Sequence, residues 1–122
     1  MQSPATQIRA DQTILILEAP MALYLVDQMI PRPSVILARG RQLDAALLRR
    51  VAPDIIVFPL IAPRFDAVQM LCQLEVLGYC GTACVIMPPL PSPEMVRDEL
   101  IAAAAGIKLV MLELPDLPPP TV

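Results

Sequence analysis

The sequence contains no histidine, no glycine-rich phosphate-binding loop and no C-x-x-C pair. A zinc site built from Cys and His ligands at the usual spacings is therefore not expected, and neither is a nucleotide site of the phosphate-loop kind. No uninterrupted apolar run reaches the roughly 18 residues of a membrane span, and the N-terminus lacks a signal-peptide pattern. These absences favour a cytoplasmic protein in which we expect no metal and no cofactor. Its three cysteines are then apolar fillers kept reduced by the cytosol, at Cys72, Cys80 and Cys84.

The composition is that of one unusually apolar domain. The chain has 122 residues, enough for a single core and too few for two. Hydrophobic residues make up 56% of it and charged residues 17%, a more apolar balance than an average soluble domain shows. The excess suggests that a second molecule covers some apolar surface. The formal net charge of −3 leaves no basic footprint, so direct binding of nucleic acid is not expected.

Short segments rich in β-branched residues and leucine predict five strands, at residues 13–17, 34–38, 55–58, 83–87 and 109–114. The third is an unbroken apolar run, as expected of a strand that is buried on both faces. It is followed by Pro59, which has no N–H to donate to a ladder, so the strand should end there. Pro63 then shapes a loop, and Asp66 is a candidate cap for the next helix.

Helical patterns lie between the strands, at residues 21–30, 42–51, 68–77 and 93 to about 106. Gly78 is expected just beyond the third helix, where a left-handed conformation is common, and Ser92-Pro93 should begin the fourth. In the second helix the spacing predicts four inward-facing side chains, Leu43, Ala46, Leu47 and Val51.

Strands that alternate with helices predict an α/β domain with a parallel sheet covered on both faces. No helix is expected after the last strand, because the ending P-D-L-P-P-P-T-V cannot be helical. The expected organisation is a flexible leader at residues 1–11, a domain at 12–115 and a proline-rich tail at 116–122.

Three runs of residues in this order resemble the receiver domain of bacterial two-component response regulators. They are D-I-I-V-F-P-L-I-A-P-R-F-D-A at 54–67, L-G-Y-C-G at 77–81 and L-E-L-P at 112–115. The resemblance covers residues 13 to 115, most of the chain. It implies a flavodoxin-like three-layer sandwich whose five-stranded parallel sheet has the order 2-1-3-4-5, with the terminal helix missing.

The positions that carry the chemistry in this family hold other residues here. The phosphoacceptor aspartate corresponds to Pro59, which cannot be a nucleophile. Two acidic residues that hold Mg²⁺ correspond to Glu18 and Ala19, and a single carboxylate is a poor magnesium site. The Ser/Thr of the fourth strand corresponds to Met87, and the lysine of the fifth to Leu114. The resemblance therefore implies a receiver domain that has lost phosphoryl transfer.

Two classes of function remain open. The first is a pseudo-receiver that is not an enzyme and regulates bacterial signal transduction through protein contacts, without phosphorylation. The alternative is a small-molecule- or nucleotide-binding enzyme on a related doubly wound fold. That alternative would have to use Cys84 or Cys72 as a nucleophile without the histidine base that usually activates one.

Under the first hypothesis we expect a homodimer or a domain of a larger protein, because a missing last helix would leave apolar sheet in need of a cover. The expected interaction surface lies near the fifth strand and comprises Met87, Pro88, Pro89, Leu90, Leu109, Met111 and Glu113. Four arginines are either a docking patch for an acidic partner or a solvated face, namely Arg39, Arg41, Arg49 and Arg50.

Overall fold

The computed structural model describes residues 12–19, 34–62, 64–104 and 106–114. Its main strands are β1 Thr13–Leu17, β2 Ser34–Ala38, β3 Ile55–Pro59, β6 Thr82–Met87 and β7 Lys108–Glu113. Two short strands, β4 Ile61–Ala62 and β5 Phe65–Asp66, form a hairpin. The helical segments are the 3-10 turn η3 Gly40–Gln42 and the helices α2 Ala45–Val51, α3 Ala67–Val76 and α4 Pro93–Ala103.

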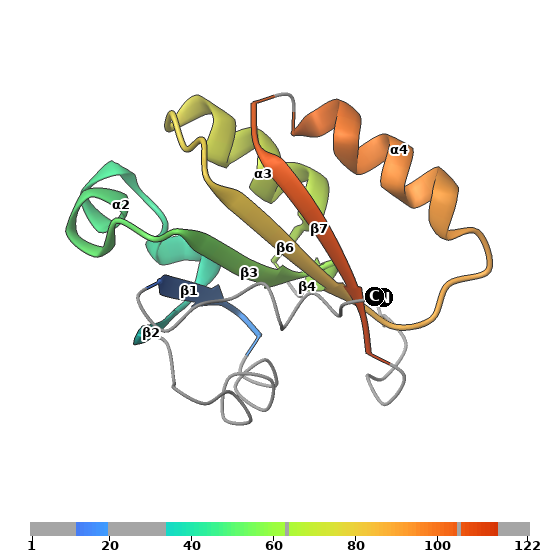
Figure 1. Cartoon of the computed structure of the whole chain (residues 1–122), viewed down its shortest axis with the longest axis horizontal. Coiled ribbons are helices and arrows are strands. Elements are labelled where there is room, and N and C mark those ends of the chain that lie inside the picture. Colours follow the sequence, from blue (N-terminus) through green and yellow to red (C-terminus); the bar gives the residue numbers. More distant parts are fainter. Residues whose placement is uncertain (1–11, 20–33, 63, 105, 115–122) are drawn as a thin grey trace.

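The five main strands form one parallel sheet in the order β2-β1-β3-β6-β7, so β2 and β7 are its edges (Figure 1). This is the flavodoxin-like order that the resemblance implies, and the prediction is confirmed. The strands β1 and β2 have the predicted bounds, and β3 ends at Pro59 as predicted. The strands β6 and β7 each begin one residue earlier than predicted, at Thr82 and Lys108.

Side chains alternate between two apolar clusters, one on each face of the sheet. On the face covered by α2, α3 and α4, the strands contribute Leu15, Leu17, Ile56, Phe58, Ala83, Val85 and Met87. On the opposite face, buried strand residues are Ile14, Ile16, Ile55, Val57, Cys84 and Ile86. Burial on both faces explains why these strands are continuous apolar runs in the sequence.

Among the described residues, no helix lies on the second face. The helix expected at residues 21–30, the leader at 1–11 and the tail at 116–122 all fall outside the described part of the chain. The expected cover of helices is therefore observed for the first face only.

Helix α3 is closed at both ends by the residues that the sequence predicts. The Asp66 carboxylate accepts a hydrogen bond from the Gln69 backbone N–H at 2.9 Å, and the Gln69 side chain accepts one from the Asp66 N–H at 3.0 Å. This reciprocal pair satisfies two N–H groups at the start of the helix. Gly78 follows its end with a φ of 81°, a conformation that glycine adopts without strain.

Helix α2 begins later than predicted. The expected helix at 42–51 is divided into η3 and α2, because the Asp44 side chain accepts a hydrogen bond from the Leu47 N–H at 2.7 Å and caps the helix there. Leu43 and Leu47 are buried as predicted, whereas Ala46 is exposed, so its predicted inward direction is wrong.

Helix α4 begins at Pro93, as predicted, and ends at Ala103 rather than near residue 106. Its N-cap residue Ser92 makes no side-chain hydrogen bond to the helix. None of the described helices is both long and apolar enough to cross a membrane.

Candidate functional site

The five parallel strands all end at the carboxyl edge of the sheet, where this class of fold places its ligands. Beyond the last residue of β3, the Leu60 N–H donates to the Ile86 carbonyl at 2.8 Å, and beyond β7 the Leu114 N–H donates to the Met87 carbonyl at 2.8 Å. The structure thus puts Pro59, Met87 and Leu114 on adjacent strands at this edge, which is where the receiver resemblance expects its phosphorylation site.

Pro59 is buried at the end of β3, in register with Ile86 of β6. Its ring has neither a hydroxyl nor a carboxylate, so no nucleophile occupies this position. The next position along the chain, Leu60, is also apolar. A phosphoryl group therefore has no side-chain acceptor at the end of β3.

Glu18 and Ala19 follow β1 and behave differently from each other. Glu18 has a φ of 56°, and its side-chain Oε1 accepts a hydrogen bond from the Gly40 N–H at 3.0 Å. The left-handed backbone and this bond hold the carboxylate beside the segment that follows β2. Ala19 is only 1% exposed and packs in the second apolar cluster. The Glu18 carboxylate therefore anchors the backbone of Gly40.

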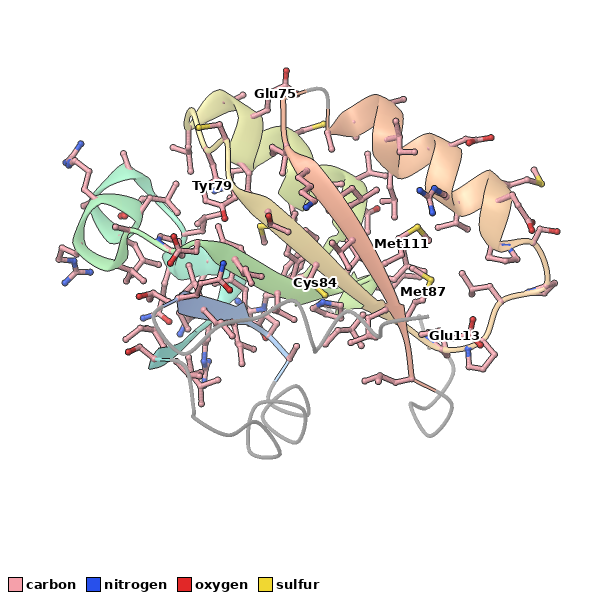
Figure 2. The ribbon with its side chains drawn as sticks, in the orientation of Figure 1. Glu75, Tyr79, Cys84, Met87, Met111 and Glu113 are labelled. Atoms are coloured by element: carbon pink, nitrogen blue, oxygen red, sulfur yellow. The ribbon has the colours of Figure 1, made fainter. Side chains whose placement is uncertain are left out.

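Met87 and Leu114 occupy the remaining two positions. Met87 is 2% exposed and packs in the first cluster, where its side chain and that of Met111 point toward α4 (Figure 2). Leu114 is half-buried and packs against the second cluster. Neither side chain can donate a hydrogen bond or a positive charge to a phosphoryl oxygen.

These residues do not fit the Mg²⁺ ion that the resemblance implies. Magnesium requires several oxygen ligands, usually including one or two carboxylates. Of the positions in question only Glu18 is acidic, and its carboxylate is bonded to Gly40. Within the described part of the chain, no three Asp, Glu or Cys side chains come together in a way that could hold a metal ion.

The interaction surface expected near the fifth strand is smaller in the structure than in the sequence prediction. Met87 and Pro88 are buried, and Met87 packs in the first apolar cluster, so they do not contribute a surface. Pro89 and Glu113 are exposed, and half-buried side chains complete the remaining set, at Leu90, Leu109 and Met111.

A second feature was not predicted: a hollow of about 280 Å³ beside the carboxyl edge. Three arginines line it, two from the segment after β2 and one from the turn of the β4–β5 hairpin. The aromatic ring of Phe65 lies against Gly40, where an added Cβ would stand 2.5 Å from the ring. The lining residues are Glu18, Arg39, Gly40, Arg41, Arg64, Phe65, Gln69, Met70 and Gln73. We call this feature the basic hollow.

The arginines of the basic hollow have no acidic partners. Arg39, Arg41 and Arg64 are exposed, and none of their guanidinium groups forms an ion pair or a hydrogen bond with the described residues. Three positive charges and the one negative charge of Glu18 give a formal charge of +2 in a chain whose net charge is −3. Sequence analysis noted Arg39 and Arg41 but grouped them with Arg49 and Arg50, which lie in the last turn of α2 outside this hollow.

Arg64 was not among the predicted site residues, because it was expected to lie in an irregular loop shaped by Pro63. The structure instead pairs Ile61 with Asp66 and Ala62 with Phe65, which makes the hairpin. A pairing of two residues on each side leaves almost no periodic signal, so this hairpin could not be found from the pattern.

The cysteines do not supply an activated nucleophile. Burial raises the pKa of the Cys84 thiol to about 12, so the thiol stays protonated at neutral pH. Cys72 and Cys80 are exposed and free. Nothing in this arrangement favours the enzyme alternative.

The sheet order and its single layer of described helices define a flavodoxin-like fold of the signal-receiver type. Three solved structures with this fold are the N-terminal domain of an uncharacterized protein from Wolinella succinogenes, a LuxR-family two-component response regulator from Aurantimonas, and a phosphorylated phytochrome response regulator from a cyanobacterium. Their respective sequence identities to this chain are 23%, 16% and 18%, and their TM-scores are 0.58, 0.62 and 0.55.

The similarity extends over most of each chain. The alignments cover 88%, 83% and 83% of this chain and 83%, 74% and 81% of the respective neighbours. No family model matches the sequence, and no curated protein matches it. The predicted resemblance to receiver domains is thus confirmed as a likeness of fold.

Proposed function

We propose that this domain is a pseudo-receiver, a receiver-like module of bacterial signal transduction that acts through protein contacts in the cytoplasm and is not switched by phosphorylation. The proposal is of a regulatory module and not of an enzyme. It combines the receiver fold with the apolar residues found where a receiver handles a phosphoryl group.

The observation that carries this proposal is the burial of Pro59 at the end of β3. Three neighbouring positions support it, because Ala19, Met87 and Leu114 also lack charged or hydroxyl side chains. Loss of a single role could be compensated by a nearby residue, but the adjacent Phe58, Leu60 and Ile86 offer only apolar groups. A signal that reaches this domain must then be transmitted through its surfaces.

Incubation with acetyl phosphate and Mg²⁺, followed by intact-mass measurement, tests the absence of phosphorylation. We expect the mass of the protein to stay unchanged under conditions that modify an active receiver treated in parallel. A stable adduct of one phosphoryl group would show that the domain retains an acceptor and would overturn the proposal.

The proposed partner is a second copy of the chain, or another domain of a longer protein, bound near β7. This strand is an edge of the sheet and has no described strand beside its outer side. The surface comprises Leu109, Met111 and Glu113 along β7 and Pro89 beyond β6, all of which are exposed or half-buried. Figure 2 shows Met111 and Glu113 on β7. An edge strand with partly exposed apolar side chains favours association.

Light scattering of the purified chain tests this interface. We expect a dimer at tens of micromolar, and we expect Glu113→Arg to weaken it. Glu75→Arg is the matched control, because Glu75 carries the same charge and is exposed at the far end of the molecule (Figure 2). A strict monomer would exclude the homodimer. Loss of the dimer on Leu37→Arg alone would move the interface to β2, the opposite edge, where Leu37 is 52% exposed.

A further inference from the structure

We propose that the basic hollow reversibly binds a phosphomonoester, that is, a phosphoryl group carried as a dianion by a small molecule or by a modified side chain. This role is separate from the proposed pseudo-receiver function. Binding here forms no covalent bond and uses none of the residues at the end of β3.

The charge of the hollow matches this ligand. Arg39, Arg41 and Arg64 contribute three positive charges and Glu18 one negative charge, which leaves +2. A phosphomonoester carries about −1.5 to −2 at pH 7. A guanidinium group presents paired N–H donors that fit the oxygens of a phosphoryl group, and these three have no acidic partner among the described residues.

The segment after β2 is held in place by its own hydrogen bonds. The Gln42 side chain accepts a hydrogen bond from the Arg39 N–H at 2.7 Å, and the Gln42 N–H donates to the Arg39 carbonyl at 2.9 Å. These two bonds fix the tight turn that carries Arg39 and Arg41. Gly40, between them, is anchored to Glu18 at 3.0 Å.

The opposite wall of the hollow, which carries Arg64, is also held in place by strand pairing and hydrogen bonds. The β4–β5 pairing fixes the turn that carries Arg64, and the reciprocal bonds between Asp66 and Gln69 join that hairpin to α3. The Gln73 side chain donates to the Leu43 carbonyl at 3.1 Å and connects α3 to the other wall. Both walls are therefore positioned before a ligand arrives, which lowers the entropic cost of binding.

The volume limits the size of the ligand. About 280 Å³ is slightly below the range for small-molecule sites, which starts at roughly 300 Å³. The hollow can hold a phosphoryl group with a short carrier. Two sources provide this chemistry: a small phosphorylated metabolite and a phosphorylated serine of a protein.

Chemical-shift titration of the ¹⁵N-labelled protein at low ionic strength tests the site in the unmodified chain. The probes are inorganic phosphate, O-phosphoserine and adenosine monophosphate, with chloride at matched ionic strength as the control. We expect saturable shifts at the amides of residues 39–42 and 64–69 with the phosphate probes, and none with chloride. Absence of saturation at these amides with all three probes would overturn the proposal.

Charge variants give effects of opposite sign. Substituting glutamine for Arg39, Arg41 or Arg64 should weaken the affinity about two- to fivefold each, as expected for exposed charge pairs. Glu18→Gln keeps the Oε1 acceptor for Gly40 but removes a negative charge, so it should strengthen binding about two- to threefold. Arg50→Gln, an equal loss of charge outside the hollow, should leave the affinity unchanged.

If Arg50→Gln weakened binding as much as Arg64→Gln, the affinity would depend only on the overall charge of the protein. A binding site in the basic hollow would then be excluded. Tighter binding of adenosine monophosphate than of O-phosphoserine supports a metabolite, the reverse order supports a modified protein, and equal affinities mean that only the phosphoryl group is recognised. Phosphoryl transfer to the chain in the acetyl phosphate experiment would affect the pseudo-receiver proposal alone.

Discussion

Two neighbouring parts of the molecule, the carboxyl edge of the sheet at Pro59 and the basic hollow, contain opposite chemistry. At the edge, Ala19 and Met87 are 1% and 2% exposed, and of the positions that the receiver resemblance implies only Glu18 holds a charged side chain. In the hollow, three arginines are exposed and form no ion pair with the residues that the structure describes. Glu18 connects the two regions, because it follows β1 at the edge and its carboxylate accepts a hydrogen bond from the Gly40 N–H in the hollow.

The difference shows that apolar and charged side chains are segregated within a few residues of the same sheet edge. Apolar side chains at the strand ends contribute to the core, since burial of a Leu or Met side chain stabilises the fold by about 1.5–3 kcal/mol. Charged groups are then tolerated only where water reaches them, as it does in the hollow. Substitutions can test whether water reaches the carboxyl edge at Pro59 and how much the contacts around the basic hollow contribute to stability.

The largest effect is expected from Pro59→Asp, which would restore the acidic residue of the receiver pattern. The carboxylate would be buried beside Ile86 in an apolar environment, so we expect a loss of about 3 kcal/mol or more in the free energy of unfolding. Urea denaturation measures this loss. Pro59→Ala is the control and should cost far less. Equal stability of the two variants would mean that water reaches the end of β3.

A smaller loss is expected from Gly40→Ala. The new Cβ would stand 2.5 Å from the Phe65 ring, which must shift. We expect a destabilisation of about 1–3 kcal/mol in urea, together with weaker phosphate binding, because the floor of the hollow would be distorted.

Gly106→Ala is the matched control for this glycine. No atom lies within 4 Å of the position that its Cβ would take, so the substitution should be neutral or slightly stabilising. If Gly40→Ala were as stable as Gly106→Ala, the contact between Gly40 and Phe65 would not support the hollow.

The cap of α3 should contribute about 1 kcal/mol. Asp66→Ala removes the acceptor for the Gln69 N–H and loosens the junction between the hairpin and the helix. Ser92→Ala, at the N-cap of α4, should cost less because Ser92 makes no capping hydrogen bond. Thermal denaturation of both variants decides this, and a larger loss for Ser92→Ala would contradict the assignment of the caps.

The smallest expected effect on stability at neutral pH is the contribution from the titration of the Cys84 thiol. Burial raises the pKa of its thiol from 9.0 to about 12, so the folded state favours the protonated form. Its contribution to stability is complete below about pH 9 and is lost as the pH rises toward 12. Burial raises the pKa of Tyr79 as well, which adds to the loss at high pH.

Urea midpoints measured from pH 7 to 11 test this dependence. We expect little change up to pH 9 from these two groups and a decline above it, which should be shallower in Cys84→Ala. A decline above pH 9 that is equally steep in Cys84→Ala would show that the thiol is not shielded from water in the folded state.

Much of the fold could be predicted from the sequence, because strands buried on both faces leave long apolar runs and helix ends leave local signals. The bounds of β1 and β2, the end of β3 at Pro59 and the cap at Asp66 follow from such signals. The prediction was wrong where two local signals competed, as at the start of α2, where Asp44 caps the helix after a separate 3-10 turn.

The residues of the candidate sites also differ in how well they could be predicted from the sequence. The apolar replacements at Ala19, Pro59, Met87 and Leu114 could be identified from the sequence, because each lies at a strand end that a pattern of strands fixes. Burial of Met87 and Pro88 could not, since burial depends on tertiary packing that the sequence pattern does not record. The expected interaction surface lost these two residues for that reason.

The sequence by itself determined the class of fold and the order of the elements, because these depend on residue type and on spacing along the chain. Only the tertiary structure decided that Arg64 lies with Arg39 and Arg41, and that Glu18 is bonded to Gly40. In the sequence, Arg64 is more than 20 positions from Arg39 and Arg41, as Glu18 is from Gly40. The crossovers and the hairpin that bring them together are fixed by packing and backbone pairing that no local pattern records.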